Sequence, residues 1–167
     1  MRLFKKKIHV FLYKLLFAVP RKLWHLKRGR YGPIEGTVIC ENKIWNVQVA
    51  MTRADRYIGL GGRTQLPQGN GMLFMYPFAD ERVFSMRGCL TPLDIAFMSA
   101  RQRVVSIHTM MVEPNRGENR LYRSWKPSKY ILEVPAGELA SAGVKIGTKV
   151  FFKSKIPPAF LADPADP

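Results

Sequence analysis

The sequence predicts a mainly β, single-domain protein of small barrel-like or sandwich-like architecture, with two short helices and a basic amphipathic helix in front of the domain. The chain has 167 residues, about the length of one domain. Hydrophobic residues make up 47% and charged residues 23%, as in globular proteins. Beyond residue 30, short alternating segments follow one another between Gly, Pro and polar clusters. The longest apolar stretch, residues 8–19, is shorter than the ~20 residues of a spanning helix, which excludes a polytopic membrane protein.

Changes in composition divide the chain into four parts. Residues 1–30 form a basic segment, residues 31–36 a glycine-containing linker, residues 37–155 the β-rich domain and residues 156–167 a proline-rich tail. Gly and Pro in the linker and the tail interrupt regular structure. We therefore expect one folded domain, with its own core, between two segments that do not belong to it.

The first elements of the domain are expected to be a hairpin and a short helix. Apolar and polar side chains alternate in residues 44–51, which is the pattern of a strand, and residues 37–40 precede them at hairpin distance. Thr52 is followed three residues later by Asp55, which is the pattern of a helix N-cap. A short helix is therefore expected from Thr52 to the glycine pair that begins at Gly61.

The rest of the domain is expected to contain further strands and one more helix. Each segment is a short apolar run bounded by Gly, Pro or polar clusters. The strands are expected at residues 71–76, 83–87, 93–98, 103–112, 130–134 and 149–153. Residues 135–143, which end on a glycine, predict the second short helix.

The charge of the chain is concentrated in residues 1–30. The whole chain carries 27 Lys and Arg against 12 Asp and Glu, a net charge of +15. Ten of the basic residues and none of the acidic ones fall within residues 1–30. This segment is therefore expected to be a functional element separate from the domain.

Residues 4–19 have the spacing of an amphipathic helix. Apolar side chains recur at the i, i+3, i+4, i+7 spacing of one helical face, and Pro20 ends the run. A second basic stretch with interleaved apolar residues follows. The side chains expected to bind a membrane or a partner are Lys5, Lys6, Lys7, Ile8, Phe11, Leu12, Leu15, Arg21, Lys22 and Trp24.

Four interpretations of this segment remain open. An interfacial helix fits both features, because apolar side chains enter the headgroup boundary while Lys and Arg face anionic lipid; packing on a partner subunit predicts the same pattern. A short spanning anchor would have basic residues on both flanks and no preferred orientation. A secretory signal would lack a small-x-small cleavage site. A nucleic-acid arm fits the charge but rarely carries so many Phe and Leu residues, so nucleic acid is the least favoured partner.

No pattern in the sequence points to catalysis, a metal or a cofactor. Two cysteines cannot form a four-cysteine zinc site, and His108 is the one histidine of the domain, whereas a metal needs several convergent ligands. Cys89 is a conceivable nucleophile with His108 as its base, but no spacing brings the two together. Cys40, on an expected strand, fits a small core residue. We therefore expect a protein that is not an enzyme and holds no metal or cofactor.

Asp94 is the acidic residue that the pattern places inside the domain. It lies between Leu93 and Ile95 at the start of an apolar run, and a buried carboxylate needs a partner. Arg87, seven residues earlier on a neighbouring strand, is the expected partner. We interpret the pair as a structural contact that fixes strand register, with the floor of a polar pocket as the alternative.

Several of these segments together resemble a known family. The pattern Arg56-x-x-Gly59-Leu60-x-x-Arg63, then Leu66-Pro67, then Gly71-Met-Leu-Phe74 is similar to the signature of the bacterial and archaeal domain-of-unknown-function family 192. The similarity continues through Phe84-x-Met86, the Pro-Leu-Asp-Ile-Ala-Phe of residues 92–97 and Tyr130-x-Leu-Glu-Val-Pro-Ala-Gly137. The resemblance spans about residues 47–152 and implies a single small β-rich domain without an assigned activity.

The chain departs from the family pattern in one loop. The family usually has Phe-Trp-Met-Lys-Asn-Thr where residues 84–89 are Phe-Ser-Met-Arg-Gly-Cys, and Met where this chain has Gly61. A changed surface loop on a retained scaffold is what a structural subunit recruited from the family would show.

The sequence therefore predicts a membrane-associated accessory or structural subunit, held at a membrane surface or on a membrane-protein complex by its basic N-terminal helix. The alternative is a small-ligand-binding protein with an uncleaved signal-like anchor. A weaker alternative is an RNA-associated factor that uses the basic segment as an arm. A pocket of converging polar groups that includes Asp94 and Arg87 would favour the ligand-binding alternative.

Overall fold

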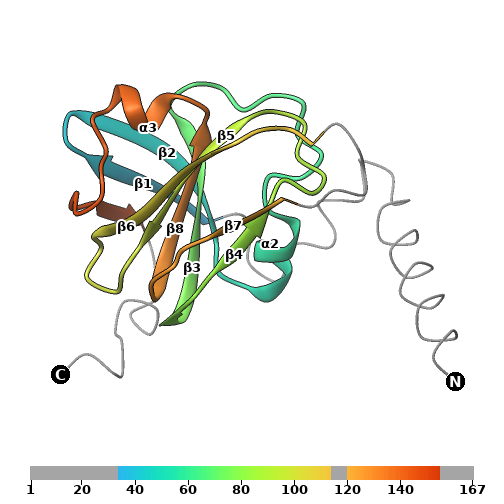
Figure 1. Ribbon diagram of the computed structural model, residues 1–167. Coiled ribbons are helices and arrows are strands. Elements are labelled where there is room, and N and C mark those ends of the chain that lie inside the picture. Colours follow the sequence, from blue (N-terminus) through green and yellow to red (C-terminus); the bar gives the residue numbers. More distant parts are fainter. Residues whose placement is uncertain (1–33, 114–119, 155–167) are drawn as a thin grey trace, which may run out of the picture. The chain divides into compact units, whose positions relative to one another are not determined.

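A computed structural model describes residues 34–113 and 120–154 (Figure 1). Within these residues the protein is mainly β with two short helices, as the sequence predicts. The predicted basic segment at residues 1–30 and the proline-rich tail lie outside the described residues, and so does the first half of the predicted linker.

The elements agree with the predicted ones, with ends shifted by a few residues. They are β1 (Ile34–Cys40), β2 (Lys43–Ala50), α2 (Arg53–Ile58), β3 (Asn70–Asp80), β4 (Val83–Ser85), β5 (Leu93–Met98), β6 (Val104–Met110), β7 (Leu121–Arg123), β8 (Ser128–Pro135), α3 (Glu138–Ser141) and β9 (Phe151–Ser154). Strand β1 begins inside the predicted linker, and β7 is a strand that the sequence did not predict.

Seven of the described strands form one sheet in the order β6-β5-β8-β3-β2-β1-β9, and β4 pairs with β7 in a separate two-stranded sheet. Neighbours in the large sheet are antiparallel except β2 and β3, which run parallel and are joined by a crossover that contains α2. The predicted N-cap of α2 is confirmed, because the hydroxyl of Thr52 accepts a hydrogen bond from the N–H of Asp55 at 3.1 Å and the capping box is complete.

The large sheet is curled, and residues 147–154 run from the edge formed by β6 to the edge formed by β1 (Figure 1). At one edge, the N–H of Val104 donates to the carbonyl of Thr148 at 3.0 Å, and the N–H of Val150 donates to the carbonyl of Gln102 at 2.9 Å. The chain then enters β9, which pairs with β1 at the opposite edge. Within the described residues β6 and β9 share no ladder, so the sheet is not closed into a barrel.

Hydrophobic cores lie on both faces of the curled sheet. The first core, inside the curl, contains Trp45 and Leu132. The second core lies on the other face, beneath the β4–β7 sheet, where the ring of Phe84 packs edge to face against Phe74 and Phe97 at centroid distances of 5.0 and 5.7 Å. Because both faces are covered, β5 is buried along its whole length and β8 nearly so, which explains their long apolar runs.

Gly71 on β3 allows the close approach of β3 and β8. A Cβ atom at this position would overlap the carbonyl oxygen of Glu133 and lie 3.0 Å from Cγ1 of Val134. Gly71→Ala is therefore expected to lower the free energy of unfolding by about 1–3 kcal/mol, as overpacking does. Urea denaturation would measure the loss.

Gly88→Ala is the matched control for this prediction. A Cβ atom at Gly88 would meet nothing within 4 Å, so only its left-handed backbone, with φ +79°, opposes the change. That conformation costs an alanine about 1–2 kcal/mol. A loss for Gly71→Ala no larger than for Gly88→Ala would contradict the close approach.

Candidate functional site

The buried carboxylate of Asp94 holds the start of α3. Asp94 lies on β5 and is 2% exposed. One oxygen accepts hydrogen bonds from the N–H groups of Gly137 at 2.8 Å and Leu139 at 3.1 Å, and the other accepts from Oγ1 of Thr109 at 2.7 Å. Gly137, the residue before α3, has no side chain to cap the helix. Asp94 on β5 therefore supplies the hydrogen-bond acceptor that the free N–H groups at the start of α3 need.

The predicted ion pair between Asp94 and Arg87 is therefore wrong in its partner. Asp94 is buried, as predicted, but Arg87 is exposed and its Nη2 donates to the hydroxyl of Tyr57 at 2.9 Å. The reason lies in the strand order. Arg87 follows β4, which covers the second core, whereas Asp94 alternates with the second-core residues Leu93 and Ile95 and so faces the other side of the sheet.

A second buried carboxylate, Glu138, holds α3 to two other elements. Glu138 is the first residue of α3 and is buried. Its Oε2 accepts a hydrogen bond from Nε1 of Trp45 on β2, and its Oε1 accepts one from the N–H of Gly69 just before β3, at 2.8 Å. Buried carboxylates are stable when their oxygens are hydrogen-bonded, as here. Asp94 and Glu138 are therefore structural groups.

A third buried carboxyl group, that of Glu133 on β8, lacks such partners. Glu133 is 4% exposed, and its register neighbours are Met72 on β3 and Ile95 on β5, which belong to the second core. Among the described residues no hydrogen bond or ion pair reaches its carboxyl group. Burial raises the pKa of Glu133 from its ordinary value of 4.5 to about 8. The group is therefore mostly protonated at neutral pH, and perturbed groups of this kind gather at functional sites.

The thiol of Cys89 is not prepared for nucleophilic attack. Burial, with smaller contributions from the carboxylates of Glu133 and Glu113, raises the pKa of Cys89 to about 12. Because the thiolate is the reactive form of cysteine, this environment keeps the side chain inert near neutral pH. Burial raises the pKa of Cys40 as well, in keeping with its predicted place in the core.

The side chain of His108 links β6 to β7. Its Nε2 lies 2.9 Å from Oγ of Ser106 and 2.9 Å from the carbonyl oxygen of Arg123. Its ring also packs edge to face on Phe97 and Tyr122 at centroid distances of 5.9 and 5.8 Å. These contacts are those of a packing residue.

Two arginines on the same face of the sheet hold backbone carbonyls around Tyr76. The guanidinium carbons of Arg82 and Arg56 lie 3.9 and 4.5 Å from the centre of the Tyr76 ring. Arg82 donates to the carbonyl of Phe78 at 2.6 Å, and Arg56 donates to the carbonyl of Met75 at 2.9 Å. Burial lowers the pKa of Arg82, and the Tyr76 ring and Asp80 oppose that effect. Both arginines therefore stabilise the turns that surround β3.

Neither a metal site nor a spanning helix is present in residues 34–113 and 120–154. No three His, Cys, Asp or Glu side chains of these residues converge as a metal ion requires. No helix in the same residues is long and apolar enough to cross a membrane. The residues expected to bind a membrane or a partner, from Lys5 to Trp24, lie outside the described part of the chain.

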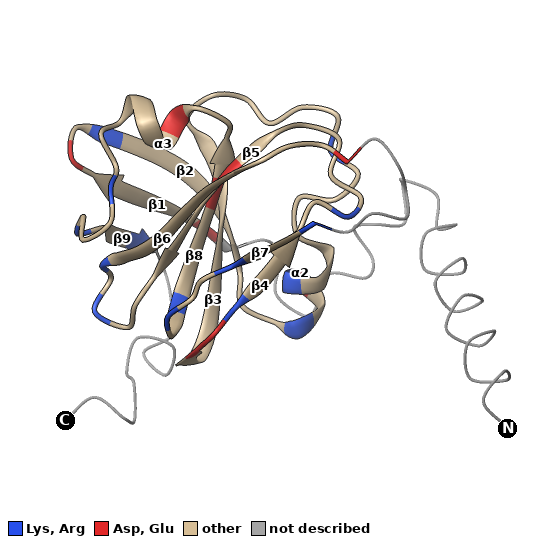
Figure 2. Cartoon of the chain, in the orientation of Figure 1, with Lys and Arg blue, Asp and Glu red and all other residues tan. Residues whose placement is uncertain are grey.

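The described surface is more basic than its composition suggests. Three of the nine carboxylate side chains in the described residues are buried, whereas only one of the fifteen Lys and Arg side chains is. Figure 2 shows basic residues on α2, on β7 and in turns at the ends of the strands. Such a surface favours an acidic partner.

Comparisons with known proteins agree with the resemblance seen in the sequence. A family model described as an uncharacterized ACR, domain-of-unknown-function family 192, matches residues 37–152. A solved protein of unknown function from Novosphingobium aromaticivorans is 29% identical, with a TM-score of 0.63 over 74% of this chain and 89% of that chain. No curated protein matches the chain.

A second solved structure has the same fold. It is a protein of Sinorhizobium meliloti, provisionally named a transcription regulator, with 23% identity and a TM-score of 0.65 over 75% of this chain and 97% of that chain. At this identity the similarity shows the fold alone.

Removing the carboxylate of Asp94 is expected to unfold the protein more easily. Asp94→Ala leaves two amides and a hydroxyl without their acceptor, which should cost about 2–4 kcal/mol of unfolding free energy. Asp80→Ala is the control. The side chain of Asp80 is 61% exposed, its ion pair with Arg82 is long, at 4.0 Å, and its Oδ1 accepts one exposed hydrogen bond, from the N–H of Glu81 at 2.8 Å, so the change should cost about 1 kcal/mol. Urea midpoints that fall equally in the two variants would contradict the role of Asp94.

Glu133 is expected to make stability fall as the pH rises. Its pKa in the folded protein, about 8, lies above its ordinary value of 4.5, so the native state binds the proton more tightly. The stabilisation is complete below about pH 4.5 and is lost towards pH 8, at up to about 1.4 kcal/mol per pH unit. Glu133→Gln should remove this dependence, whereas Glu81→Gln, at an exposed position, should keep it. Urea titrations from pH 5 to 9 measure it, and parallel curves for Glu133→Gln and the wild type would refute it.

Proposed function

Because the chain belongs to domain-of-unknown-function family 192, whose description assigns no activity, we propose its function from its own charge and surface. It is a non-enzymatic accessory subunit held at an anionic membrane surface, or on a membrane-protein complex, by residues 1–30. One observation carries the proposal: ten basic residues and no acidic residue share this segment with apolar residues at helical spacing.

Two independent contributions to the binding free energy, one electrostatic and one hydrophobic, would hold residues 1–30 on lipid. Each Lys or Arg close to an anionic surface contributes about 1 kcal/mol, and this attraction fades over a Debye length of about 8 Å at physiological salt. The apolar face, which includes Ile8, Phe11 and Leu15, contributes a second term through burial that salt does not screen. A segment with both terms binds more firmly than charge alone allows.

The domain supports the proposal through its surface and its chemistry. The surplus of basic side chains at its surface would add to the attraction of residues 1–30 for an anionic partner. The side chains that most resemble catalytic groups do not act as such: Asp94 and Glu138 bind α3 through hydrogen bonds, and burial keeps the thiol of Cys89 protonated. A scaffold with an added binding segment fits an accessory subunit.

Charge reversal and polar substitution in residues 1–30 should separate the electrostatic from the hydrophobic contribution to vesicle binding. Replacing Lys5, Lys6 and Lys7 by Glu should weaken binding to vesicles of phosphatidylcholine and phosphatidylglycerol and flatten its salt dependence. Replacing Phe11 and Leu15 by Ser should weaken binding about tenfold at every salt concentration with the same slope. Vesicle sedimentation over a salt series measures both effects.

Other outcomes of this experiment identify the competing interpretations. A spanning anchor would stay in membranes after the Glu changes and leave them only in detergent. A segment docked on a protein would be indifferent to lipid charge. Competition by RNA that releases the chain from vesicles, with tighter binding to RNA than to lipid, would overturn the proposal in favour of an RNA-associated factor.

The pocket of Asp94 and Arg87 that would favour small-ligand binding does not form, so this second candidate function depends on Glu133 alone. A buried protonated carboxyl group without a partner offers one donor and one acceptor side by side, the pattern that an amide group of a ligand would complete. Native mass spectrometry of the purified chain tests this candidate. A bound small molecule present with the wild type and absent with Glu133→Leu would support it, and bare protein in both would refute it.

A further inference from the structure

We propose that the outer face of the β4–β7 sheet is a second membrane contact, through which the domain itself lies on an anionic lipid surface. The inference rests on the proposed function and adds the orientation of the domain. The contact, called here the Trp125 face, consists of Tyr57, Val83, Arg87, Leu121, Arg123 and Trp125.

The side chains of the Trp125 face follow from the alternation of its strands. In residues 121–125 exposed and buried side chains alternate, so that Leu121, Arg123 and Trp125 point outwards while Tyr122 and Ser124 are buried. Val83 on β4 is the register partner of Arg123. Val83 therefore lies beside the outward side chains of β7 on the same face of the small sheet.

Helix α2 extends this face beyond β4. Arg87 lies two residues after the end of β4, and its Nη2 donates to the hydroxyl of Tyr57 at 2.9 Å. Its guanidinium carbon lies 5.7 Å from the centre of the Tyr57 ring. The hydrogen bond and the ring contact join Tyr57 of α2 to Arg87, which follows β4 of the small sheet.

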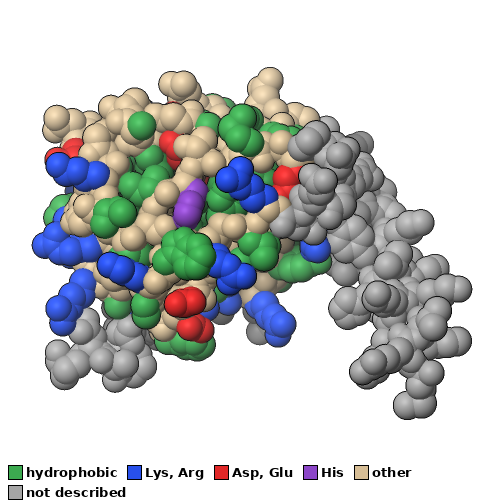
Figure 3. All heavy atoms as spheres, in the orientation of Figure 1, with side chains coloured by type: hydrophobic (Ala, Val, Ile, Leu, Met, Phe, Trp, Pro, Cys, Tyr) green, Lys and Arg blue, Asp and Glu red, His purple; other side chains and the backbone are tan. Residues whose placement is uncertain are grey.

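Most of the exposed large hydrophobic side chains belong to the segments that form or flank the small sheet. Of the eleven large hydrophobic side chains that are exposed in the described residues, eight lie on α2, β4 or β7, or on the chain segments that lead into or out of β4 and β7. They are Tyr57, Phe78, Val83, Leu90, Met111, Val112, Leu121 and Trp125. Figure 3 shows hydrophobic side chains intermixed with Lys and Arg on the side of the molecule that carries the small sheet. Contiguous apolar patches mark interaction surfaces, and Val83 lies beside the outward side chains of β7.

The charge of the face fits an anionic surface. Five exposed basic side chains lie on or beside it: Arg53, Arg87, Arg120, Arg123 and Lys126. Four carboxylates lie on the same segments: the exposed Asp80 and Glu81 between β3 and β4, and the half-exposed Asp55 on α2 and Glu113 before β7. The five basic side chains are all exposed and outnumber them, and guanidinium groups match the geometry of lipid phosphates.

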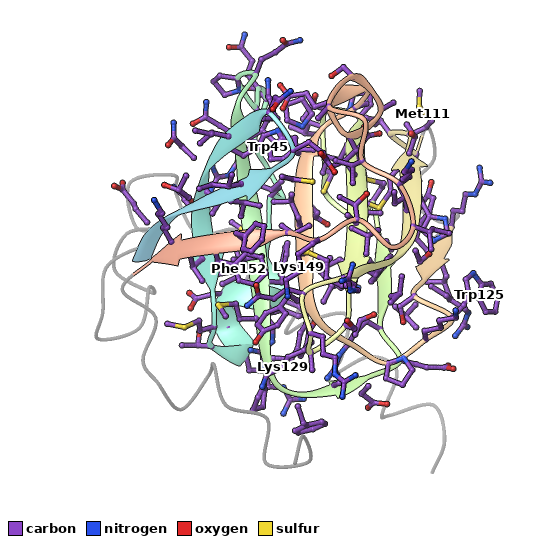
Figure 4. All side chains as sticks on the ribbon, turned by 90° about the vertical axis from the view of Figure 1, so that its left-hand side faces the viewer. Trp45, Met111, Trp125, Lys129, Lys149 and Phe152 are labelled. Atoms are coloured by element: carbon purple, nitrogen blue, oxygen red, sulfur yellow. The ribbon has the colours of Figure 1, made fainter. Side chains whose placement is uncertain are left out.

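The backbone presents Trp125 in a strained conformation. Its φ is +56°, a left-handed value that is strained for a bulky side chain. Its side chain is 69% exposed, the largest value among the exposed hydrophobic side chains. Figure 4 shows Trp125 projecting from the edge of the molecule, whereas Trp45 lies inside the sheet.

Hydrogen bonds with Arg82, in the turn between β3 and β4, hold this strained conformation in place. The N–H of Ser124 donates to the carbonyl of Arg82 at 3.0 Å, and the N–H of Arg82 donates back to Oγ of Ser124 at 3.0 Å. The hydroxyls of Ser124 and Ser128, both fully buried, donate to the carbonyl of Lys126 at 2.7 and 3.1 Å. A rigid turn that exposes a tryptophan loses little entropy when the ring is buried by a partner.

Lipid is the occupant that these features favour together. Tryptophan prefers the membrane interface, because its ring is apolar and its N–H can still reach water or headgroups. Apolar side chains next to exposed arginines repeat the combination found in residues 1–30. Two contacts of this kind on one chain bind a membrane more firmly than either does alone.

The experiment follows the fluorescence of Trp125 in the full chain. Trp24→Phe leaves Trp45, which is fully buried, and Trp125 as emitters. Vesicles of phosphatidylcholine and phosphatidylglycerol carry bromine atoms on their acyl chains, which quench tryptophan only at contact. We expect the emission of Trp125 to be quenched by these vesicles, and the quenching to disappear when Trp125→Phe is added.

A binding measurement with paired variants complements the fluorescence. Val83→Ser with Leu121→Ser should lower the partition coefficient of the full chain about tenfold. Ile44→Ser with Ile146→Ser, at positions that are 58% and 67% exposed elsewhere on the surface, should change it by about twofold or less. Arg123→Glu should weaken binding mainly at low salt.

The outcomes distinguish this inference from the proposed function. Binding to vesicles without quenching of Trp125, and with no effect of the Val83 and Leu121 changes, would overturn the inference and leave the role of residues 1–30 intact. No binding of the full chain to anionic vesicles would overturn both. Equal losses for the two pairs of serine variants would also overturn it, because the effect would then not belong to the Trp125 face.

Discussion

The hydrogen bonds of Asp94 at the start of α3 are the constraint on which the rest of the domain depends. They place α3 beside the start of β5, and Leu139 belongs to the first core. From this position Glu138 reaches Trp45 on β2 and the amide that precedes β3. One helix of a single turn thus connects strands that lie far apart in the sequence, and two buried carboxylates, both satisfied, fix how the sheet curls around its inner core.

The local parts of this structure could be predicted from the sequence, and the non-local parts could not. The β1–β2 hairpin, the cap of α2 at Thr52 and the bounds of β5 depend on neighbouring residues, whose pattern is visible in the chain. Strand β7 has only three residues and exists because it pairs with β4, so no apolar run announces it. The burial of Asp94 was predictable from its neighbours, but its backbone donors lie more than forty residues away.

Glu133 illustrates the same limit at the candidate site. In an amphipathic strand a charged residue between apolar ones faces solvent, and the sequence of β8 permits that reading. Solvent does not reach Glu133 because the small β4–β7 sheet covers the second core on that face of the large sheet. The strands of the small sheet come from segments that precede and follow β5 and β6 in the chain. The buried carboxyl group is therefore a product of tertiary structure, and its raised pKa has no counterpart in the residues next to it.

The passage of residues 147–154 from one side of the sheet to the other also protects the protein from self-association. Free strand edges recruit strands of other molecules, and long flat edges lead to aggregates. Residues 147–150 occupy part of the edge of β6, and β9 occupies the edge of β1. Within the described residues β9 is four residues long and carries the exposed Lys153, and a short, charged edge discourages further pairing. A single short segment, residues 147–154, thus covers part of both edges of the unclosed sheet.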